Sequence, residues 1–282
     1  MKNNLRILGM ALCMLPMWLR AETVQGLQPA YQSAPGQNTQ PAELIPTGTI
    51  IPVSLNSALQ SDKTGSGAAV TATVMQDVPL SGGETLRRGS KVTGHVVEAM
   101  ASGKEAHQAR LSFQFDRVQL GNRTVPIATN VRAVASPHAV VEASPQRSSE
   151  ATDYAVEIGG DEISYGEGGL VMVGSQVVGK YTSHGVLANV AQDPGSPCGA
   201  TIDSDAQPQA FWLFSVNACG AYGLGDLKIV QAGQTEAIGE VTLASDGKAV
   251  KVEKGSGMLL RVVGSGAEEA HAFTTPSRAP GQ

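Results

Sequence analysis

The sequence predicts an all-β protein with two β-barrel or β-sandwich domains, joined by a polar linker and preceded by a signal peptide and a disordered spacer. Three observations carry this prediction. Apolar residues alternate with polar ones in many short runs, which is the period of a half-buried strand. The 282-residue chain contains 33 glycines, and only 16% of its residues are charged and 4% aromatic. This composition is typical of an exported β-rich protein rather than a cytosolic helical enzyme.

The N-terminal segment predicts a targeting signal followed by a spacer. Lys2 and Arg6 precede an apolar run at residues 7–19, and Ala21 follows as a small residue for cleavage. This pattern is typical of a signal peptide over residues 1–21, with an uncleaved anchor as the alternative. Residues 22–43 are rich in Gln, Pro, Ala and Ser without an apolar period, which indicates a disordered spacer. We therefore expect a periplasmic or secreted protein.

The first β-domain is expected at residues 44–136. After Phe115 the alternation of apolar residues slips by one position. A side-chain face cannot flip within a regular strand, so we expect a β-bulge near Asp116 and Arg117. The residues that mark the strands by alternation are Ile51, Val53, Leu55, Val70, Ala72, Val74, Val92, Val96, Leu111, Phe113, Phe115, Val118 and Leu120.

The second β-domain is expected at residues 155–264, after a polar linker at 137–154 and before a disordered tail at 265–282. Both flanking segments are polar and lack an apolar period. Within the domain, strand-like runs occupy residues 170–173, 176–181, 186–190, 209–216, 226–230, 237–243, 249–252 and 258–263.

The run "QAFWLFSV" at residues 209–216 is apolar on both faces. It therefore predicts a central strand that is covered on both sides. Trp212 and Phe214 would then pack in a core. The alternative is an exposed stacking platform for a sugar or a peptide.

Removal of the signal peptide changes both the cysteine count and the charge. Cys198 and Cys219 remain, and an even pair in an oxidising compartment predicts a disulfide, with two free thiols as the alternative. Loss of Lys2, Arg6 and Arg20 takes the formal net charge from −5 to −8. An acidic chain disfavours binding to nucleic acid and gives no reason for attraction to anionic lipid.

No pattern in the sequence predicts a catalytic, cofactor-binding or metal site. A nucleophile elbow, a phosphate-binding loop and a dinucleotide fingerprint are all missing. None of the histidines stands at metal-ligand spacing from another; they are His95, His107, His138, His184 and His271. One acidic cluster would serve a hydrolytic site, and it comprises Glu157, Asp161, Glu162 and Glu167. Acidic residues in a Gly-rich loop are usually solvated, so we expect no enzyme and no cofactor.

Residues 45–131 carry a series of motifs in a fixed order: "IPTGTIIPVSL", "VTATVMQDV", "LRRGSKVTGH" and "ARLSFQFDRVQL". This stretch resembles the C-terminal domain of the TrbI-type scaffold proteins of bacterial conjugation and type IV secretion channels. The resemblance implies a small β-barrel or sandwich that acts through protein contacts, with no catalytic residues. That family has a longer membrane-crossing helix than residues 7–19 and a pore-lining helical segment that this sequence lacks after Val131. The second domain does not match.

Together these observations predict a non-enzymatic exported envelope protein that acts as a structural or protein-binding β-module. Its partners would be envelope proteins, and self-association through sheet edges is open. One alternative is a component of a type IV secretion or conjugation channel, and another is a carbohydrate-active or hydrolytic β-protein. Two carboxylates facing each other in a concave pocket would favour the enzyme. An exposed apolar sheet edge would favour partner binding.

Overall fold

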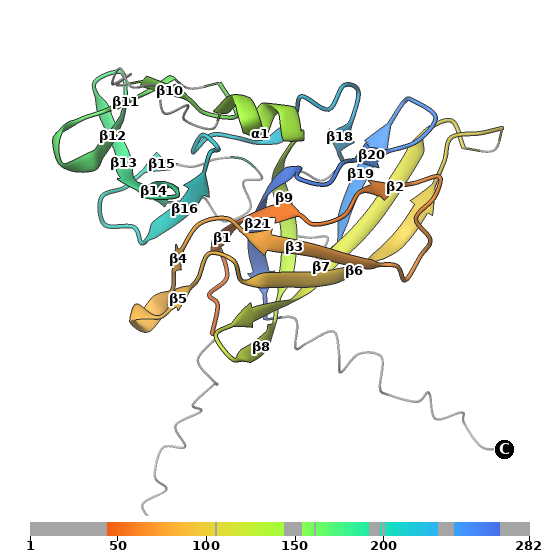
Figure 1. The fold of residues 1–282 in the computed structure, drawn as a ribbon, viewed down its shortest axis with the longest axis horizontal. Helices are drawn as coiled ribbons and strands as arrows, with labels where there is room; N and C mark the ends of the chain where they lie inside the picture. The colour runs from red at the N-terminus through yellow and green to blue at the C-terminus, as the bar shows by residue number, and fades with distance from the viewer. Residues whose placement is uncertain are drawn as a thin grey trace, which may run out of the picture. The chain divides into compact units, whose positions relative to one another are not determined.

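The computed structural model shows an all-β fold with one α-helix in its described part, α1 (Pro137–Ala143) (Figure 1). The predicted fold class is therefore confirmed. None of the helices in that part has the length and apolar content needed to cross a membrane. The predicted signal peptide, spacer and tail, apart from residue 265 of the tail, lie outside the described residues. The structure describes residues 44–104, 106–143, 154–160, 162–191, 198, 201–230 and 240–265.

Ten strands pair into one sheet, named here the barrel sheet, in the order β17-β9-β21-β1-β3-β6-β7-β19-β18 with β8 also beside β7. Its strands are β1 (Ile50–Leu55), β3 (Ala69–Val74), β6 (Lys91–Met100), β7 (Ala109–Leu120), β8 (Arg123–Pro126), β9 (Ala128–Ala135), β17 (Gly220–Tyr222), β18 (Lys228–Ile229), β19 (Val241–Ser245) and β21 (Gly257–Gly264).

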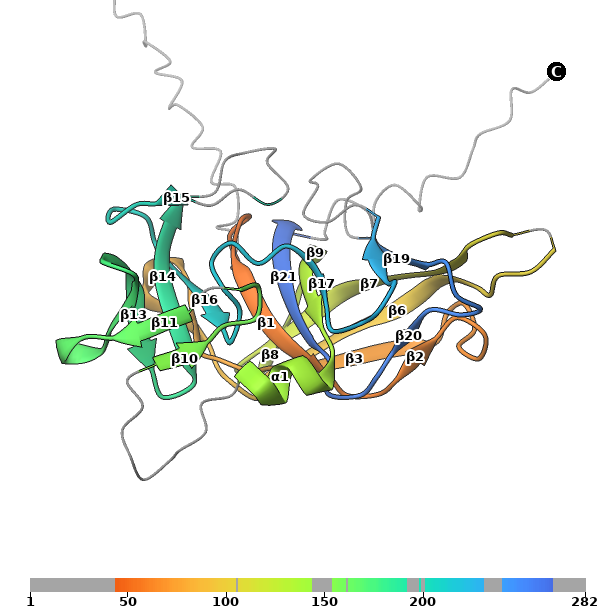
Figure 2. The same ribbon diagram turned by 90° about the horizontal axis from the view of Figure 1, so that it is seen from above.

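Seven strands form the second sheet, in the order β10-β11-β12-β13-β14-β15 with β16 also beside β14. Figures 1 and 2 show these strands gathered on one side of the barrel sheet. They are β10 (Tyr154–Val156), β11 (Glu162–Tyr165), β12 (Leu170–Val173), β13 (Gln176–Thr182), β14 (Gly185–Ala191), β15 (Thr201–Ile202) and β16 (Pro208–Trp212). Two short pairs complete the description: β2 (Leu59–Gln60) with β20 (Lys251–Val252), and β4 (Val78–Pro79) with β5 (Thr85–Leu86).

The predicted bulge lies in β7 and helps the barrel sheet to close. Thr93 pairs with Arg117 and Gly94 pairs with Phe115, so Asp116 is the extra residue. A Cβ atom on Gly94 would lie 1.7 Å from the backbone oxygen of Gln114, so only glycine fits opposite the bulge. The Ile127 N–H, just before β9, donates to the Asp116 carbonyl oxygen at 3.0 Å. The start of β9 is thereby tied to β7, and the sheet is nearly closed.

The alternating residues of the predicted first domain fill the interior of the barrel sheet. Phe113 and Phe115 meet there edge to face, with ring centroids 5.8 Å apart. Burial of such side chains removes about 25 cal/mol of unfavourable hydration per Å² of apolar surface. The aliphatic residues around them are fully or almost fully buried and include Ile51, Val53, Leu55, Val70, Val74, Val92, Val96, Leu111, Val118, Met258 and Leu260.

Three barrel strands are buried on both faces, and their outer faces hold the second sheet. Ile50 of β1, Ala133 of β9 and Leu259 of β21 point away from the barrel interior into a second core. Phe211 and Phe214 join them there and are fully buried. Residues of the second sheet complete this core: Ile163, Val171, Val178, Val186, Ala188 and Val190.

The sheets do not follow the predicted division into residues 44–136 and 155–264. The last part of the predicted second domain, from β17 to β21, forms strands of the barrel sheet or pairs with β2. β21 lies between β1 and β9, with Ile51 opposite Leu260 and Val134 opposite Met258. These runs are apolar on both faces, and local periodicity does not show which distant strand each one pairs with.

The predicted polar linker at 137–154 begins with helix α1. Ser136 caps this helix, since its Oγ accepts the Ala139 N–H at 3.1 Å. Pro137 occupies the first helical position, where no N–H is needed. Residues 144–153 lie outside the described part.

The run at residues 209–216 is only partly a strand. β16 ends at Trp212, whose φ of +53° is rare for a residue with a side chain. The chain then turns, and the Phe214 N–H donates to the Phe211 carbonyl oxygen at 2.8 Å. The expectation that these aromatic side chains pack in a core is confirmed, because Phe211, Trp212 and Phe214 are all buried.

Candidate functional site

A cavity of about 290 Å³ opens beside the second sheet. Tyr165 from β11, Tyr181 from β13 and Trp212 from the end of β16 line it. The two tyrosine rings meet edge to face, with centroids 5.0 Å apart. Its size lies just below the usual range of small-ligand sites, about 300–1,000 Å³, and its walls combine aromatic and polar groups as such sites do.

The backbone at Trp212 is held in its strained conformation by a buried amide. The Trp212 N–H donates to Oε1 of Gln76 at 2.6 Å, and Nε2 of Gln76 donates to the Val186 carbonyl oxygen at 3.0 Å. Gly185 makes room for this arrangement, since a Cβ atom there would lie 2.5 Å from Cα of Trp212. Strained residues of this kind cost about 1–3 kcal/mol and cluster at binding and catalytic sites.

The cavity lining includes a buried carboxylate and phenol groups. Glu157, which follows β10, is only 6% exposed and lines the cavity. Burial, followed by the neighbouring Tyr181 and the charge of Glu157, raises the pKa of Tyr165 to about 12. Tyr165 therefore stays protonated at neutral pH and can donate a hydrogen bond.

The cavity lining also contains basic residues. Arg88 lines the cavity, and so do Ser183 and His184, which form the two-residue turn between β13 and β14. Asp77 lies close to this group: its pKa is lowered first by the Arg88 N–H that it accepts, and further by Arg87 and His184. The lining therefore combines groups of opposite charge.

Ser183 and His184 also raise the question of a nucleophile. The Ser183 Oγ and Nδ1 of His184 lie 2.8 Å apart. An activated serine needs a third group that orients the histidine. No described carboxylate is hydrogen-bonded to His184.

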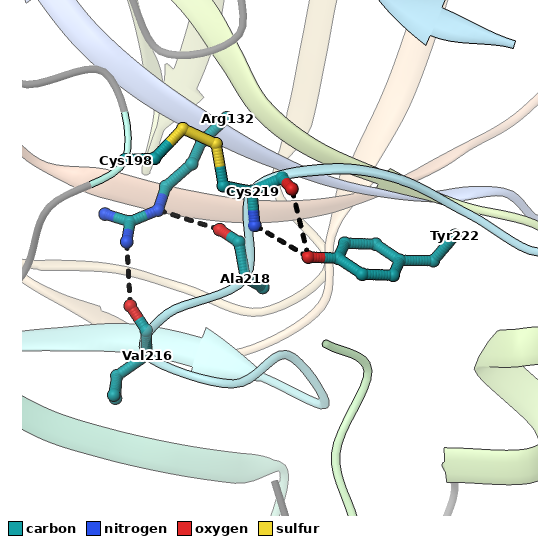
Figure 3. The surroundings of a disulfide bond; sticks show 6 residues. All are labelled: Arg132, Cys198, Val216, Ala218, Cys219 and Tyr222. Atoms are coloured by element: carbon teal, nitrogen blue, oxygen red, sulfur yellow. Dashed lines mark hydrogen bonds between the residues drawn. A yellow bond between two sulfur atoms is a disulfide. The ribbon is translucent and has the colours of Figure 1, made fainter. Parts of the chain in front are cut away.

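The predicted disulfide between Cys198 and Cys219 is confirmed (Figure 3). The two Cα atoms lie 5.6 Å apart, within the usual range for a bridge. The hydroxyl of Tyr222 binds both backbone groups of Cys219, accepting from its N–H at 2.8 Å and donating to its carbonyl oxygen at 3.1 Å. The bridge thus fixes the segment that leads from the second sheet into β17.

A buried arginine also holds this segment (Figure 3). Arg132 of β9 is 1% exposed and donates to the carbonyl oxygens of Val216 at 2.7 Å and Ala218 at 2.9 Å. Burial and then the charge of Arg261 lower its pKa to about 10. This role was not predicted, although a single arginine within the apolar run of β9 indicates a buried polar contact.

The edge of the second sheet at β10 is the third notable feature. Among the described residues, β10 pairs only with β11. Val156 at this edge is 60% exposed, and a further cavity of about 400 Å³ lies between it and Ala139 and Ala143 of α1. An apolar residue at an open strand edge is a template for pairing with another chain.

The remaining residues singled out from the sequence do not converge. Nδ1 of His95 lies 3.1 Å from Oδ2 of Asp116, and His138 pairs with Glu142 within α1. The described residues contain no group of three potential ligands that could hold a metal ion. Of the predicted acidic cluster, Glu157 is buried and Glu167 is exposed. Asp161, the side chain of Glu162, and His271 lie outside the described part, and His107 is exposed.

Comparison with known proteins finds no family model that matches this chain and no matching curated protein.

Proposed function

We propose that this protein is a non-enzymatic, exported envelope protein that binds another polypeptide along the open edge of β10. The observation that carries the proposal is the contrast between this edge and the nearly closed barrel sheet. Val156 at this edge exposes its apolar side chain. Helix α1 lies beside β10, and Ala139 and Ala143 of α1 line a cavity together with Val156 (Figure 2). A partner strand added there would gain backbone hydrogen bonds and a place for alternate side chains.

Export to an oxidising compartment is supported by the disulfide. Such bonds persist in secreted and periplasmic proteins and are rare in the cytosol. The basic and apolar start of the sequence is consistent with the route of export.

The non-enzymatic part of the proposal is supported by the cavity beside the second sheet. Glycoside hydrolysis, the hydrolytic alternative, uses two carboxyl groups on either side of the scissile bond. Among the described side chains that line the cavity, Glu157 is the one carboxylate.

A role in a conjugation or type IV secretion channel is the second candidate. It is favoured by the strands that carry the TrbI-like motifs, β1, β3, β6 and β7, which are consecutive neighbours in the nearly closed barrel sheet. The resemblance implies such a barrel as a scaffold for protein contacts. Under this candidate, the polypeptide at β10 would be another channel component.

A pull-down from envelope extract tests the proposal. Bait carrying Val156→Lys should retain the partner at least tenfold less than the parent, because a lysine on an edge strand opposes strand addition. Val230→Lys is the matched control: Val230 is 45% exposed, directly after β18 at an end of the barrel sheet. Equal retention by the two variants would contradict a site at β10.

A further inference from the structure

Part of the lining of the cavity beside the second sheet has the chemistry of a cation site. Tyr165, Tyr181 and Trp212 line the cavity, and so does Glu157, whose charge acts on Tyr165. Aromatic rings attract organic cations through their quadrupole, by about 0.5–2 kcal/mol each according to exposure. A nearby carboxylate adds direct charge attraction, which is strong where water is excluded.

Another part of the lining suits an anion. Arg88, Ser183 and His184 line the cavity, and Arg88 and His184 both act on Asp77. Asp77 accepts hydrogen bonds from the Arg88 N–H at 2.7 Å and from the Arg87 side chain at 3.1 Å. The exposed side chain of Arg88 can pair with a carboxylate or another small anion.

We propose that this cavity binds a short zwitterion, with its ammonium group beside Glu157 and the aromatic rings and its carboxylate facing Arg88 and His184. The volume limits the size of the ligand. One water occupies about 30 Å³ of liquid, so 290 Å³ accommodates about ten non-hydrogen atoms. An ω-amino acid or a single free amino acid has this size.

Charge complementarity distinguishes a zwitterion from simpler ligands. A plain cation would be attracted by Glu157 but repelled by Arg88, and a plain anion would meet the reverse. A ligand with both charges is attracted by both of these lining groups.

The walls of the cavity are also preorganised. The strained backbone of Trp212 is fixed by Gln76, and Gly185 allows its close approach to the β13–β14 turn. A site that is rigid before binding loses less entropy when the ligand arrives. The strained backbone at Trp212 would therefore contribute to ligand binding as well as to packing.

Binding can be measured with purified full-length protein by isothermal titration calorimetry. The probes are glycine, 3-aminopropionate, 4-aminobutyrate and 6-aminohexanoate, which differ only in the distance between the charges. Butylamine and butyrate lack one charge each. We expect one chain length to bind best, and both single-charge analogues to bind at least tenfold more weakly. In a Trp18→Phe background the fluorescence of Trp212 should report the same binding, because the chain has only two tryptophans.

Variants test the acidic and the basic lining residues separately. Glu157→Gln should weaken the best probe at least tenfold, and Arg88→Gln should do the same while leaving butylamine no weaker. Arg87→Gln is the matched control, because Arg87 is the exposed neighbour that does not line the cavity. Should Glu157→Gln fail to fold, Tyr165→Leu tests the same part of the lining.

Three results would overturn the proposal. One is that no amino acid in the series binds with a Kd of about 10 mM or lower, because weaker binding lies outside the useful range of small-molecule sites. Another is butylamine or butyrate binding as tightly as the best zwitterion. The third is an equal loss of affinity in the Arg87→Gln and Arg88→Gln variants. These assays need no protein partner. A negative result would therefore not bear on partner binding at the β10 edge, which the pull-down tests separately.

Discussion

The two sheets of this protein treat their edges differently. The barrel sheet brings the start of β9 back to the bulge of β7, so the sheet is nearly closed. In the second sheet, β16 lies against the barrel, with Oε1 of Gln209 accepting the Ile50 N–H. At the far end, β10 pairs only with β11 in the described part of the chain. Closure of a sheet removes the risk of unwanted pairing with other chains. A strand edge that stays open is therefore a candidate site for pairing with a partner strand.

The sheets also differ in what supports them. The barrel encloses a core of its own, built from the inner faces of its strands. The second sheet has no such enclosure and packs on the outer faces of β1, β9 and β21. The second sheet should therefore depend on the barrel for its stability more than the barrel depends on it. Four changes test this difference.

The largest effect is expected from Phe113→Ala in the barrel core. Truncation of a fully buried phenylalanine costs about 3–5 kcal/mol through lost burial and the cavity left behind. Because the second sheet rests on barrel strands, hydrogen exchange should accelerate in both sheets. Val177→Ala, on an exposed part of β13, is the control and should change the free energy of unfolding by less than about 0.5 kcal/mol. Faster exchange in the barrel alone would show that the second sheet stands by itself.

Removal of the disulfide should have the next largest effect. The bridge spans 21 positions, and closing a loop of this length is worth about 3 kcal/mol in the chain-entropy model. For a folded region in the 150–250-residue class, Cys219→Ser should lower Tm by about 10 °C. Differential scanning calorimetry measures this shift in Tm. A single shifted transition is expected, since Cys219 precedes β17, which pairs with β9. An unchanged Tm would contradict the role of the bridge as a tie between the sheets.

Loss of the Gln76 amide should destabilise the junction of the sheets by about 2 kcal/mol. Gln76→Leu leaves the Trp212 N–H and the Val186 carbonyl oxygen buried without this partner. Urea denaturation gives the free energy of unfolding. The exposed Gln119 of β7 offers the same substitution at a site without these contacts, and Gln119→Leu should be nearly neutral. Equal effects of the two variants would argue against the clamp.

The smallest effect concerns pH and Tyr165. Its pKa rises from 10 to about 12 in the folded protein, so the folded state holds the phenolic proton more tightly than the unfolded state does. This contribution is complete below pH 10 and is lost as the pH rises through 12. Tyr165→Phe should therefore make the fall of unfolding free energy between pH 10 and 12 shallower. Parallel curves for the variant and its parent would contradict the shift.

Local features of this fold were predictable from the sequence. The slip of the apolar pattern after Phe115 gave the bulge at Asp116, and the cysteine count gave the bridge. The strands at residues 170–190 follow from alternation alone. The capped start of α1 was also readable, because Ser136 followed by Pro137 is a typical helix N-terminus.

Long-range features were not predictable in this way. β21 inserts between β1 and β9, and neither its composition nor its period names these partners. The turn at Trp212 has no glycine to announce it, because the conformation is imposed by Gln76, which lies 136 positions earlier. The cavity depends on the contact between Gln76 and Trp212 and on Glu157. The sequence shows these residues, but it does not show that they lie around one cavity.

Site-specific photo-cross-linking in intact cells tests the use of the open edge most directly. A photoreactive amino acid is placed at Val156 beside β10, or at Val230 after β18 as the matched position on the barrel sheet. We predict a discrete cross-linked adduct in the envelope fraction from position 156 and none from position 230. Mass spectrometry of the adduct then identifies the polypeptide, including a second copy of this chain. Absence of an adduct at position 156, or the same adduct from both positions, would contradict partner binding at the β10 edge.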